Sequence, residues 1–239
     1  MAITFRGTSG FGGGSGQSTS WATSTVASCA TDDIAYACIA LLEQSAGDIV
    51  TSVATNGTAT VSGWTEIVNL FGSGTGYNQV SVWWTRVTAG GTLGATFTLS
   101  LSSAAACGIA VFIGGSTDAN PHVTPVTNGG TGSPMTGTAI TPAATGDWVV
   151  HVLGYMGAQD IVATASPAFV QRLEQRSALS DTTDRCTLHI ETYETPSTSN
   201  VTAAPTTANS RNWRSGTFVL KLPGAAGSGA RLLFRHYEG

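Results

Sequence analysis

Apolar and polar residues alternate with a period of two in several stretches of this chain, and this pattern constrains the fold more than any other feature. Successive side chains of a β-strand point to opposite faces of a sheet, so sustained alternation predicts strands with one buried face. The clearest cases are residues 80–85, 96–102, 186–191 and 218–222. Residues 170–178 also carry a weak helical pattern, but we favour a strand there. The sequence therefore predicts an all-β protein.

The composition agrees with many strands joined by tight turns. The 239 residues are 41% hydrophobic, include 30 glycines and many threonines, and are only 10% charged. Roughly a quarter of residues are charged in an ordinary soluble domain. Threonine favours strands and glycine favours turns. A chain of this length can bury a hydrophobic core without metal ions or disulfides.

The four cysteines are widely spaced, at Cys29, Cys38, Cys107 and Cys186. The first residues, MAITFRG, do not have the charged and apolar regions of a signal peptide, so we expect synthesis in a cytoplasm. Disulfides are rare there, and we predict reduced thiols that behave as small hydrophobes.

The chain divides into three segments by composition. Residues 1–30 are predicted to be a Gly/Ser/Thr-rich N-terminal arm anchored by its aromatic residues, and residues 31–223 a β-sandwich body. Residues 224–239 combine a linker with a C-terminal docking peptide, so flexible arms flank the body. Inside the body, Asn56-Gly57 predicts the two-residue turn of a hairpin, because this pair tolerates positive φ angles.

Segments of the body resemble others further along the chain. The sequence DIAYACIALLE from Asp33 resembles DWVVHVLGYMG from Asp147, at an offset of 114 residues. Residues 63–68, 78–88 and 108–113 resemble segments from residues 168, 184 and 216, at offsets of about 106 residues. Two interpretations stay open, an internal duplication and a chance alignment. We predict a double-sheet, jelly-roll-like β-sandwich, and the first interpretation would build it from two similar halves.

Recognisable catalytic patterns are absent from the sequence. The glycine-rich run from Gly10 to Gly16 lacks the Gly-Lys-Ser/Thr ending of a phosphate-binding loop, and no Gly-x-Ser-x-Gly elbow occurs. A glycosidase would need two carboxylates ~5–10 Å apart, and the candidate glutamates are scattered: Glu43, Glu66, Glu174 and Glu191. We predict no enzyme activity and no catalytic or cofactor-binding residues.

Metal sites have little support. His151 and His189 could meet across a sheet and bind a metal ion with Glu191 or Glu194, but no ligand spacing supports this, and we favour two sheet-surface histidines. The acidic pairs Asp32-Asp33 and Asp181/Asp184 lack the pattern of a calcium loop and are expected to cap turns. We therefore predict no cofactor and no metal.

The charge distribution excludes other partners. The net charge is −4, Lys221 is the single lysine, and the nine arginines are spread along the chain. Nucleic-acid binding needs a basic stripe, and a membrane helix needs ~20 apolar residues. We expect neither partner. Trp83 and Trp84 must point to opposite faces of one strand, so one of them could be exposed and stack on a sugar.

The order of four segments resembles tailed-bacteriophage virion structural proteins with a jelly-roll-like β-sandwich, which include capsid decoration or cement proteins and minor tail or fibre modules. The segments are IAYACIALL at 34–42, GWTEI at 63–67, VSVWWTRVT at 80–88, and residues 96–115. The likeness covers residues 32–223, and GWT and VWWTRV are its most specific parts. It implies a sandwich fold and a role in particle assembly, and it carries no catalytic residues.

Together these observations predict a non-enzymatic structural protein of a phage virion, made in the host bacterial cytoplasm. We favour a capsid decoration or cement protein that bridges neighbouring subunits; the alternatives are a minor tail or tail-fibre subunit and a carbohydrate-binding adhesion module. The expected partners are other virion proteins and further copies of this chain. The predicted partner-binding residues lie in the two arms: Phe5, Phe11, Trp21, Arg231, Leu232, Leu233, Phe234, Arg235 and Tyr237.

Overall fold

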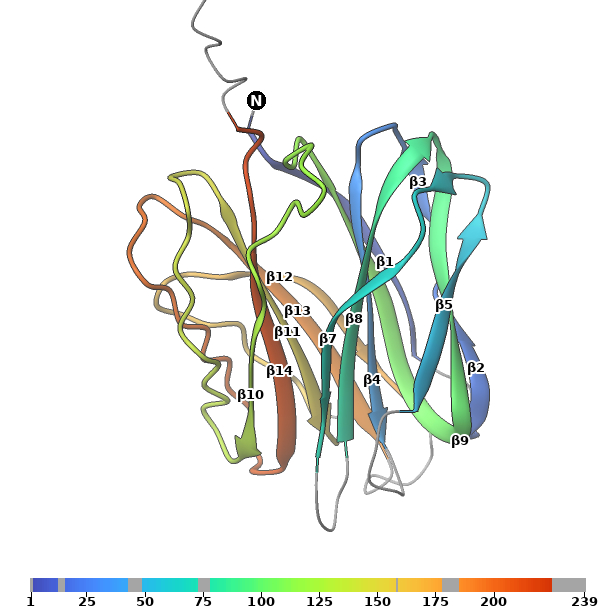
Figure 1. The fold of residues 1–239 in the computed structure, drawn as a ribbon. Helices are drawn as coiled ribbons and strands as arrows, with labels where there is room; N and C mark the ends of the chain where they lie inside the picture. Colours follow the sequence, from blue (N-terminus) through green and yellow to red (C-terminus); the bar gives the residue numbers. More distant parts are fainter. Residues whose placement is uncertain are drawn as a thin grey trace, which may run out of the picture.

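The computed structural model describes residues 2–12, 16–42, 49–72, 78–157, 159–177 and 185–224, and it shows an all-β protein (Figure 1). These residues form fourteen strands and no helix, and thus no helix that could cross a membrane. The strands are β1 (Thr4–Gly12), β2 (Ser18–Ala22), β3 (Val26–Cys29), β4 (Ile34–Leu42), β5 (Val50–Gly57), β6 (Thr60–Val61), β7 (Thr65–Phe71), β8 (Asn78–Ala89), β9 (Gly91–Ile113), β10 (Val126–Thr131), β11 (Trp148–Met156), β12 (Val170–Arg176), β13 (Cys186–Glu194) and β14 (Asn212–Leu220). The predicted fold class is confirmed, and residues 170–176 are a strand, as expected.

The described strands form two antiparallel sheets, one of nine strands and one of five. Strand β9, which is 23 residues long, joins two layers of the larger sheet. Its first half, up to Ser103, pairs with β2, β3 and β5 in an outer layer, and its second half pairs with β1 and β4 in a central layer. Figure 1 shows these two layers beside the five-stranded sheet, so the sandwich has three layers.

The central layer explains why β4 is a continuous apolar run. Tyr36 and Cys38 pack toward the five-stranded sheet, whereas Ala37 and Ile39 pack toward the outer layer. All nine residues of β4 are buried. A strand that is buried on both faces needs apolar residues at every position, so the alternating pattern disappears.

The five-stranded sheet repeats the central layer strand for strand. The orders are β1-β9-β4-β8-β7 and β10-β14-β11-β13-β12. The pairing register repeats as well: Ile34 lies opposite Phe112 and Arg86, while Trp148 lies opposite Leu220 and Glu194. Even the register shift recurs, between Glu66 and Val68 in β7 and between Gln171 and Leu173 in β12. The chain therefore has two similar halves.

The turns before β4 and β11 show the same repeat at the level of single hydrogen bonds. Asp32 and Gly146 both have positive φ angles, 70° and 87°, and each donates its backbone N–H to a carbonyl at the end of β8 or just after β13. The buried Asp33 carboxylate accepts from the N–H of Ala30 at 2.8 Å, and Asp147 accepts from that of Ala144 at 2.8 Å. The expectation that Asp33 caps a turn is thus confirmed; Asp181 and Asp184 lie outside the described residues.

Two local predictions were wrong. The described part of residues 1–30 is not a separate arm, because β1, β2 and β3 all pair with β9 and are integral to the sheets. Asn56-Gly57 is not a hairpin turn either: both residues continue β5 opposite β9, and β6 pairs with β8 instead. The backbone N–H and carbonyl groups of a glycine-rich segment can form strand hydrogen bonds when a long strand such as β9 lies beside it. The sequence pattern of the segment itself does not reveal that neighbouring strand.

The apolar residues of the alternating stretches are buried as predicted, among them Phe97, Leu99, Leu188, Ile190, Phe218 and Leu220. Other buried residues of the same layers are Ile34, Tyr36, Ile109, Val111, Trp148 and Val150. Trp64 is only partly buried. Leu101 is exposed, because it lies where β9 leaves the outer layer and turns into the central one.

Candidate functional site

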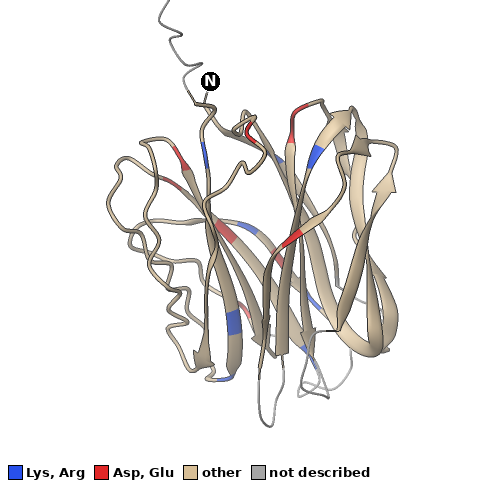
Figure 2. Cartoon of the chain, in the orientation of Figure 1, with Lys and Arg blue, Asp and Glu red and all other residues tan. Residues whose placement is uncertain are grey.

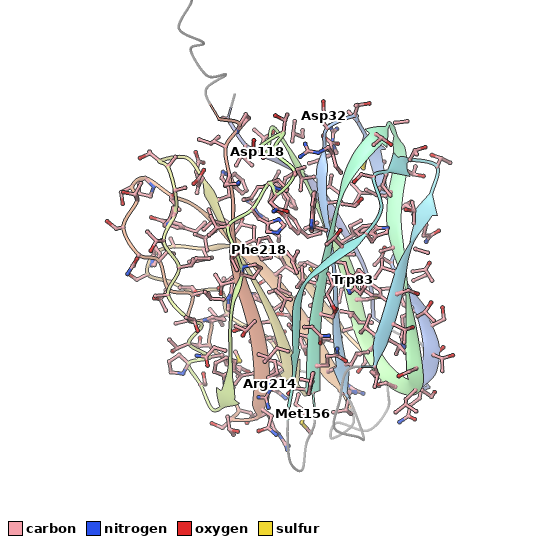
Figure 3. All side chains as sticks on the ribbon, viewed as in Figure 1. Asp32, Trp83, Asp118, Met156, Arg214 and Phe218 are labelled. Carbon is pink, nitrogen blue, oxygen red and sulfur yellow. The ribbon has the colours of Figure 1, made fainter. Side chains whose placement is uncertain are left out.

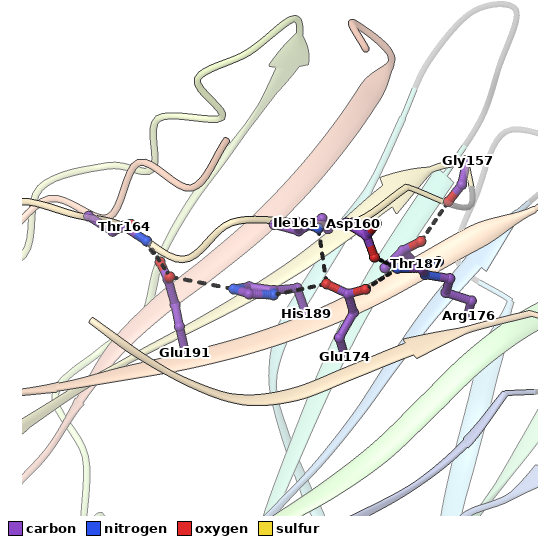
Figure 4. A network of polar contacts seen from close by, with 9 residues as sticks. All are labelled: Gly157, Asp160, Ile161, Thr164, Glu174, Arg176, Thr187, His189 and Glu191. Carbon is purple, nitrogen blue, oxygen red and sulfur yellow. Dashed lines mark hydrogen bonds and ion pairs between the residues drawn. The ribbon is translucent and has the colours of Figure 1, made fainter. Parts of the chain in front are cut away.

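A cluster of polar side chains lies on the face of the five-stranded sheet that points away from the central layer. Strands β11, β13 and β14 contribute His151, His189, Glu191 and Thr217, and the segment after β11 contributes Thr164. The described parts of segments 132–147, 159–169 and 195–210 cover this face and add apolar residues such as Ile140, Phe169 and Val201. We call these five polar residues and Glu174 of β12 the outer-face cluster; Figure 4 shows its part around His189.

Glu191 is the centre of the cluster and is fully buried. Its carboxylate accepts the backbone N–H of Thr164 at 2.8 Å and the hydroxyl of Thr164 at 2.7 Å. His189 Nε2 lies 3.4 Å from the same carboxylate. Burial acts to raise the pKa of Glu191, but the hydrogen bond from His189 and the other donors outweigh it, so the pKa is lowered. The carboxylate is held as an anion by fixed donors.

His189 lies between two carboxylates. Its Nδ1 is 3.9 Å from Glu174 Oε2, and its Nε2 faces Glu191 (Figure 4). Glu174 also accepts the backbone N–H of Ile161 at 3.0 Å and forms an ion pair with Arg176, which pairs with Asp160 as well. The ring therefore connects the buried Glu191 to an ion-pair group near the surface.

His151 occupies the other side of Glu191, directly across β11 and β13 in register. Its Nδ1 is 2.8 Å from the hydroxyl of Thr217, while Nε2 is buried without a partner among the described residues. Burial lowers the pKa of His151 to about 4, so the ring is neutral at physiological pH. The groups that hold the Glu191 carboxylate are therefore the N–H and hydroxyl of Thr164 and the ring of His189.

The outer-face cluster has acid–base groups but no access for a substrate. His151, His189 and Glu191 have no exposed surface. A general acid or base must come within hydrogen-bond reach of a reacting group, which the covering segments prevent. The arrangement instead fixes the segment around Thr164 to the sheet through the Glu191 carboxylate. Thr164 in turn accepts the backbone N–H of Ala204 at 2.7 Å, which joins a second covering segment to the first.

The sequence identified only some of this cluster. His151, His189 and Glu191 share one sheet face, but both histidines are fully buried under the covering segments, so the prediction of sheet-surface histidines is wrong. Thr164 was missed because it comes from a loop with no distinctive pattern. Glu194 lies at the exposed end of β13. In the part of the chain that the structure describes, no group of three or more His, Cys, Asp or Glu side chains is arranged to hold a metal ion.

Of the other glutamates considered for catalysis, the structure describes only Glu66. Glu66 of β7 accepts the Ser81 hydroxyl at 2.8 Å on the opposite half of the molecule. Glu43 lies outside the described residues. The four cysteines are free, buried thiols, and burial raises the pKa of Cys107 and of Cys186 to about 12. Such thiols are poor nucleophiles because the thiolate is not populated.

The predicted partner-binding residues of the N-terminal segment have different fates. Phe5 packs in an edge-on contact with Phe112 and lies under the guanidinium of Arg172. Trp21 is buried, and its Nε1 donates to the carbonyl of Ser103 at 3.1 Å. Both side chains are thus engaged within their own chain. Phe11 is 40% exposed and stays available.

The C-terminal docking residues cannot be placed. Arg231, Leu232, Leu233, Phe234, Arg235 and Tyr237 all lie outside the described residues. Comparisons with family models, with curated proteins and with solved structures found no match for this chain. The function must therefore be argued from the chain's own geometry.

Proposed function

We propose that this chain is a non-enzymatic structural subunit that acts by packing against other proteins, in a tailed-bacteriophage particle. The observation that carries the proposal is the closure of the outer-face cluster: its acid–base groups are sealed under loops and spent on holding the fold. Because these acid–base groups are buried, other proteins can contact only the outer surface and the exposed strand edges of the chain.

The surface fits such a role. Charged side chains are few and scattered over the described residues, as Figure 2 shows. Large apolar side chains are exposed at separate places, among them Phe11 at the end of β1 and Phe71 at the end of β7. Phe11 lies 6.3 Å from the ring of Trp21 and lines a shallow, mostly apolar hollow with it. Aromatic residues in such hollows are frequent anchors of protein interfaces.

Within a particle, we favour a capsid decoration or cement protein over a minor tail or fibre subunit. A compact three-layer body suits a clamp on a surface, whereas a fibre more often has repeated or coiled-coil segments. A carbohydrate-binding adhesion module needs an exposed aromatic platform. None of the six tryptophans is exposed: Trp83 and Trp64 are partly buried and the other four are buried. We therefore place this alternative last.

Immunogold electron microscopy would test the proposal. Antibodies raised against the recombinant chain would be applied to purified particles of the phage whose genome encodes it, with mass spectrometry of the same particles. We expect gold on the head surface. Gold confined to the tail would replace decoration with the tail alternative, and particles that lack the chain by both methods would overturn a virion role.

A further inference from the structure

The duplicated fold gives the sandwich two comparable edges, and they differ. At one edge β1 of the central layer lies against β12 of the five-stranded sheet. This edge is closed: a Cβ at Gly10 would lie 2.4 Å from Gln175 Cγ, and Thr8 donates to the carbonyl of Arg172 at 3.0 Å. At the other edge, β7 and β10 take the corresponding places. There the two sheets leave an open groove of about 500 Å³ beside Leu70, the counterpart of Gln175 in the repeat.

One cation occupies this groove. Arg214 of β14 lies across the backbone of Gly129, where a Cβ would be 2.6 Å from Arg214 Cδ. Its guanidinium reaches Gly72, where a Cβ would be 2.5 Å from Nη2. Nη1 donates to the carbonyl of Trp213 at 2.7 Å. Two glycines thus make room for the side chain and set its position; Figure 3 labels Arg214 low on β14.

The charge of Arg214 has no counter-ion among the described residues, since every ion pair found there involves other groups. The adjoining segment 73–77 has the sequence SGTGY and holds no carboxylate. Partial burial lowers the pKa of Arg214, because the groove removes part of the hydration of the cation. A partly dehydrated arginine gains most from a hydrogen-bonded anion.

We infer that this groove, which we call the Arg214 groove, binds a carboxylate of an acidic segment of another protein chain. Strand β10 forms the rim and pairs only with β14 among the described strands. Residues 136–138 already lie beside its first residues, since Thr138 donates to the Thr127 carbonyl at 2.9 Å, so an extended segment can lie beside residues 129–131. The polar side chains of Asn128, Thr131 and Asn212 line the same groove. Arg214 is the single cation among the described residues that line the groove, which matches the single charge of a carboxylate better than a phosphate with nearly two.

This inference rests on the proposed function only in taking a protein as the partner. Arginine side-chain NMR of the full-length chain would test it, with the Nε–H signals followed during titration with triglutamate, with inorganic phosphate and with triglutamine. We expect triglutamate to shift the Arg214 signal saturably and triglutamine to leave it in place. Phosphate should bind more weakly than triglutamate.

Two variants make the test specific. Arg214→Gln should weaken triglutamate binding by about tenfold or more, since a charge-assisted bidentate contact is lost. Arg211→Gln is the matched control, because Arg211 is exposed, lies just before β14 and does not line the groove; its affinity should stay within about twofold. Arg214→Lys keeps the charge without the planar fork and should also bind more weakly, which covers any loss of folding in the glutamine variant.

The opposing results are clear. Equal binding by wild type and both Arg214 variants would overturn the site. Tighter binding of phosphate than of triglutamate would overturn the ligand class, and an unchanged Arg214 signal at saturating triglutamate would overturn both. Each of these failures is independent of whether the chain is found in phage particles, so the proposed function would be judged separately.

Discussion

The outer-face cluster makes a quantitative prediction for the substitution Glu191→Leu. Leucine removes the acceptor of three donors: the Thr164 N–H at 2.8 Å, the Thr164 hydroxyl at 2.7 Å and His189 Nε2 at 3.4 Å. Each buried donor without an acceptor costs about 1–3 kcal/mol, so three of them would cost about 3–9 kcal/mol if nothing moved. We expect a loss of about 3–5 kcal/mol, because the Thr164 segment can relax toward water.

The assay is urea unfolding at pH 7, with thermal melting in parallel. For a chain of this length, ~1 kcal/mol corresponds to about 2–4 °C, so the melting temperature should fall by on the order of 10 °C. Glu191→Gln keeps the shape and one acceptor but loses the charge, and should cost about 1–2 kcal/mol. The control is Glu194→Gln, at an exposed position on the same strand, with an effect within about 0.5 kcal/mol. A Glu191→Leu variant that loses less than about 1 kcal/mol would show that the cluster does not hold the loop.

Two further predictions concern the stability of the fold at low pH and the glycines with positive φ angles. Burial lowers the folded-state pKa of His151 to about 4, below its ordinary value of about 6.5. The unfolded chain takes up this proton first, so stability should be complete above pH 6.5 and fall by about 3 kcal/mol toward pH 4; His151→Gln should flatten that part of a pH series of urea unfolding curves. Gly57 and Gly63 have φ angles of 122° and 105°, but only at Gly57 would a Cβ strike backbone, 2.3 Å from the Thr92 carbonyl. Gly57→Ala should therefore lower the melting temperature clearly more than Gly63→Ala, and equal effects would refute the steric argument.

The sequence predicted those parts of the fold that depend on one strand at a time. Phe97 and Leu99 are buried, as their alternation with threonine and serine requires, and the two-sided burial of β4 accounts for its unbroken apolar run. The repeat was also visible, because the equivalent strands keep the same face pattern. Pattern analysis works here because a residue's face follows from its own position in the strand.

The remaining features depend on contacts between distant strands. The glycine-rich start of the chain forms β1 because β9 offers an unpaired edge to it, and composition does not reveal that edge. Likewise, Glu174 meets His189 only because β12 and β13 pair in one particular register, with a shift between Gln171 and Leu173. The Arg214 groove needs both sheets at once. None of these depends on a local sequence signal.

The contact between the halves supplies the last prediction. In each half an aliphatic side chain of the other half packs against a glycine: Leu173 of β12 against Gly108 of β9, and Val68 of β7 against Gly216 of β14. A Cβ at Gly108 would lie 2.1 Å from Leu173 Cδ2, and one at Gly216 would lie 2.6 Å from Val68 Cγ2. These pairs are equivalent in the repeat, since Gly216 lies 108 residues after Gly108 and Leu173 lies 105 residues after Val68. The pseudo-symmetric interface is thus packed by the same device twice.

The two alanine substitutions should nevertheless differ. At Gly108 the obstacle is the end of a leucine, which can change rotamer, whereas both methyl groups of Val68 stand within 2.7 Å of the new Cβ at Gly216 and are attached to a stiff, branched carbon. Overpacking a core costs about 1–3 kcal/mol, and we expect Gly216→Ala near the upper end and Gly108→Ala near the lower. Double-mutant cycles of urea unfolding would measure the coupling of each glycine substitution to Val68→Ala. We expect a coupling energy of at least about 1 kcal/mol between Val68→Ala and Gly216→Ala, and none between Val68→Ala and Gly108→Ala. Equal coupling to both glycines would mean that the two halves do not pack through these pairs.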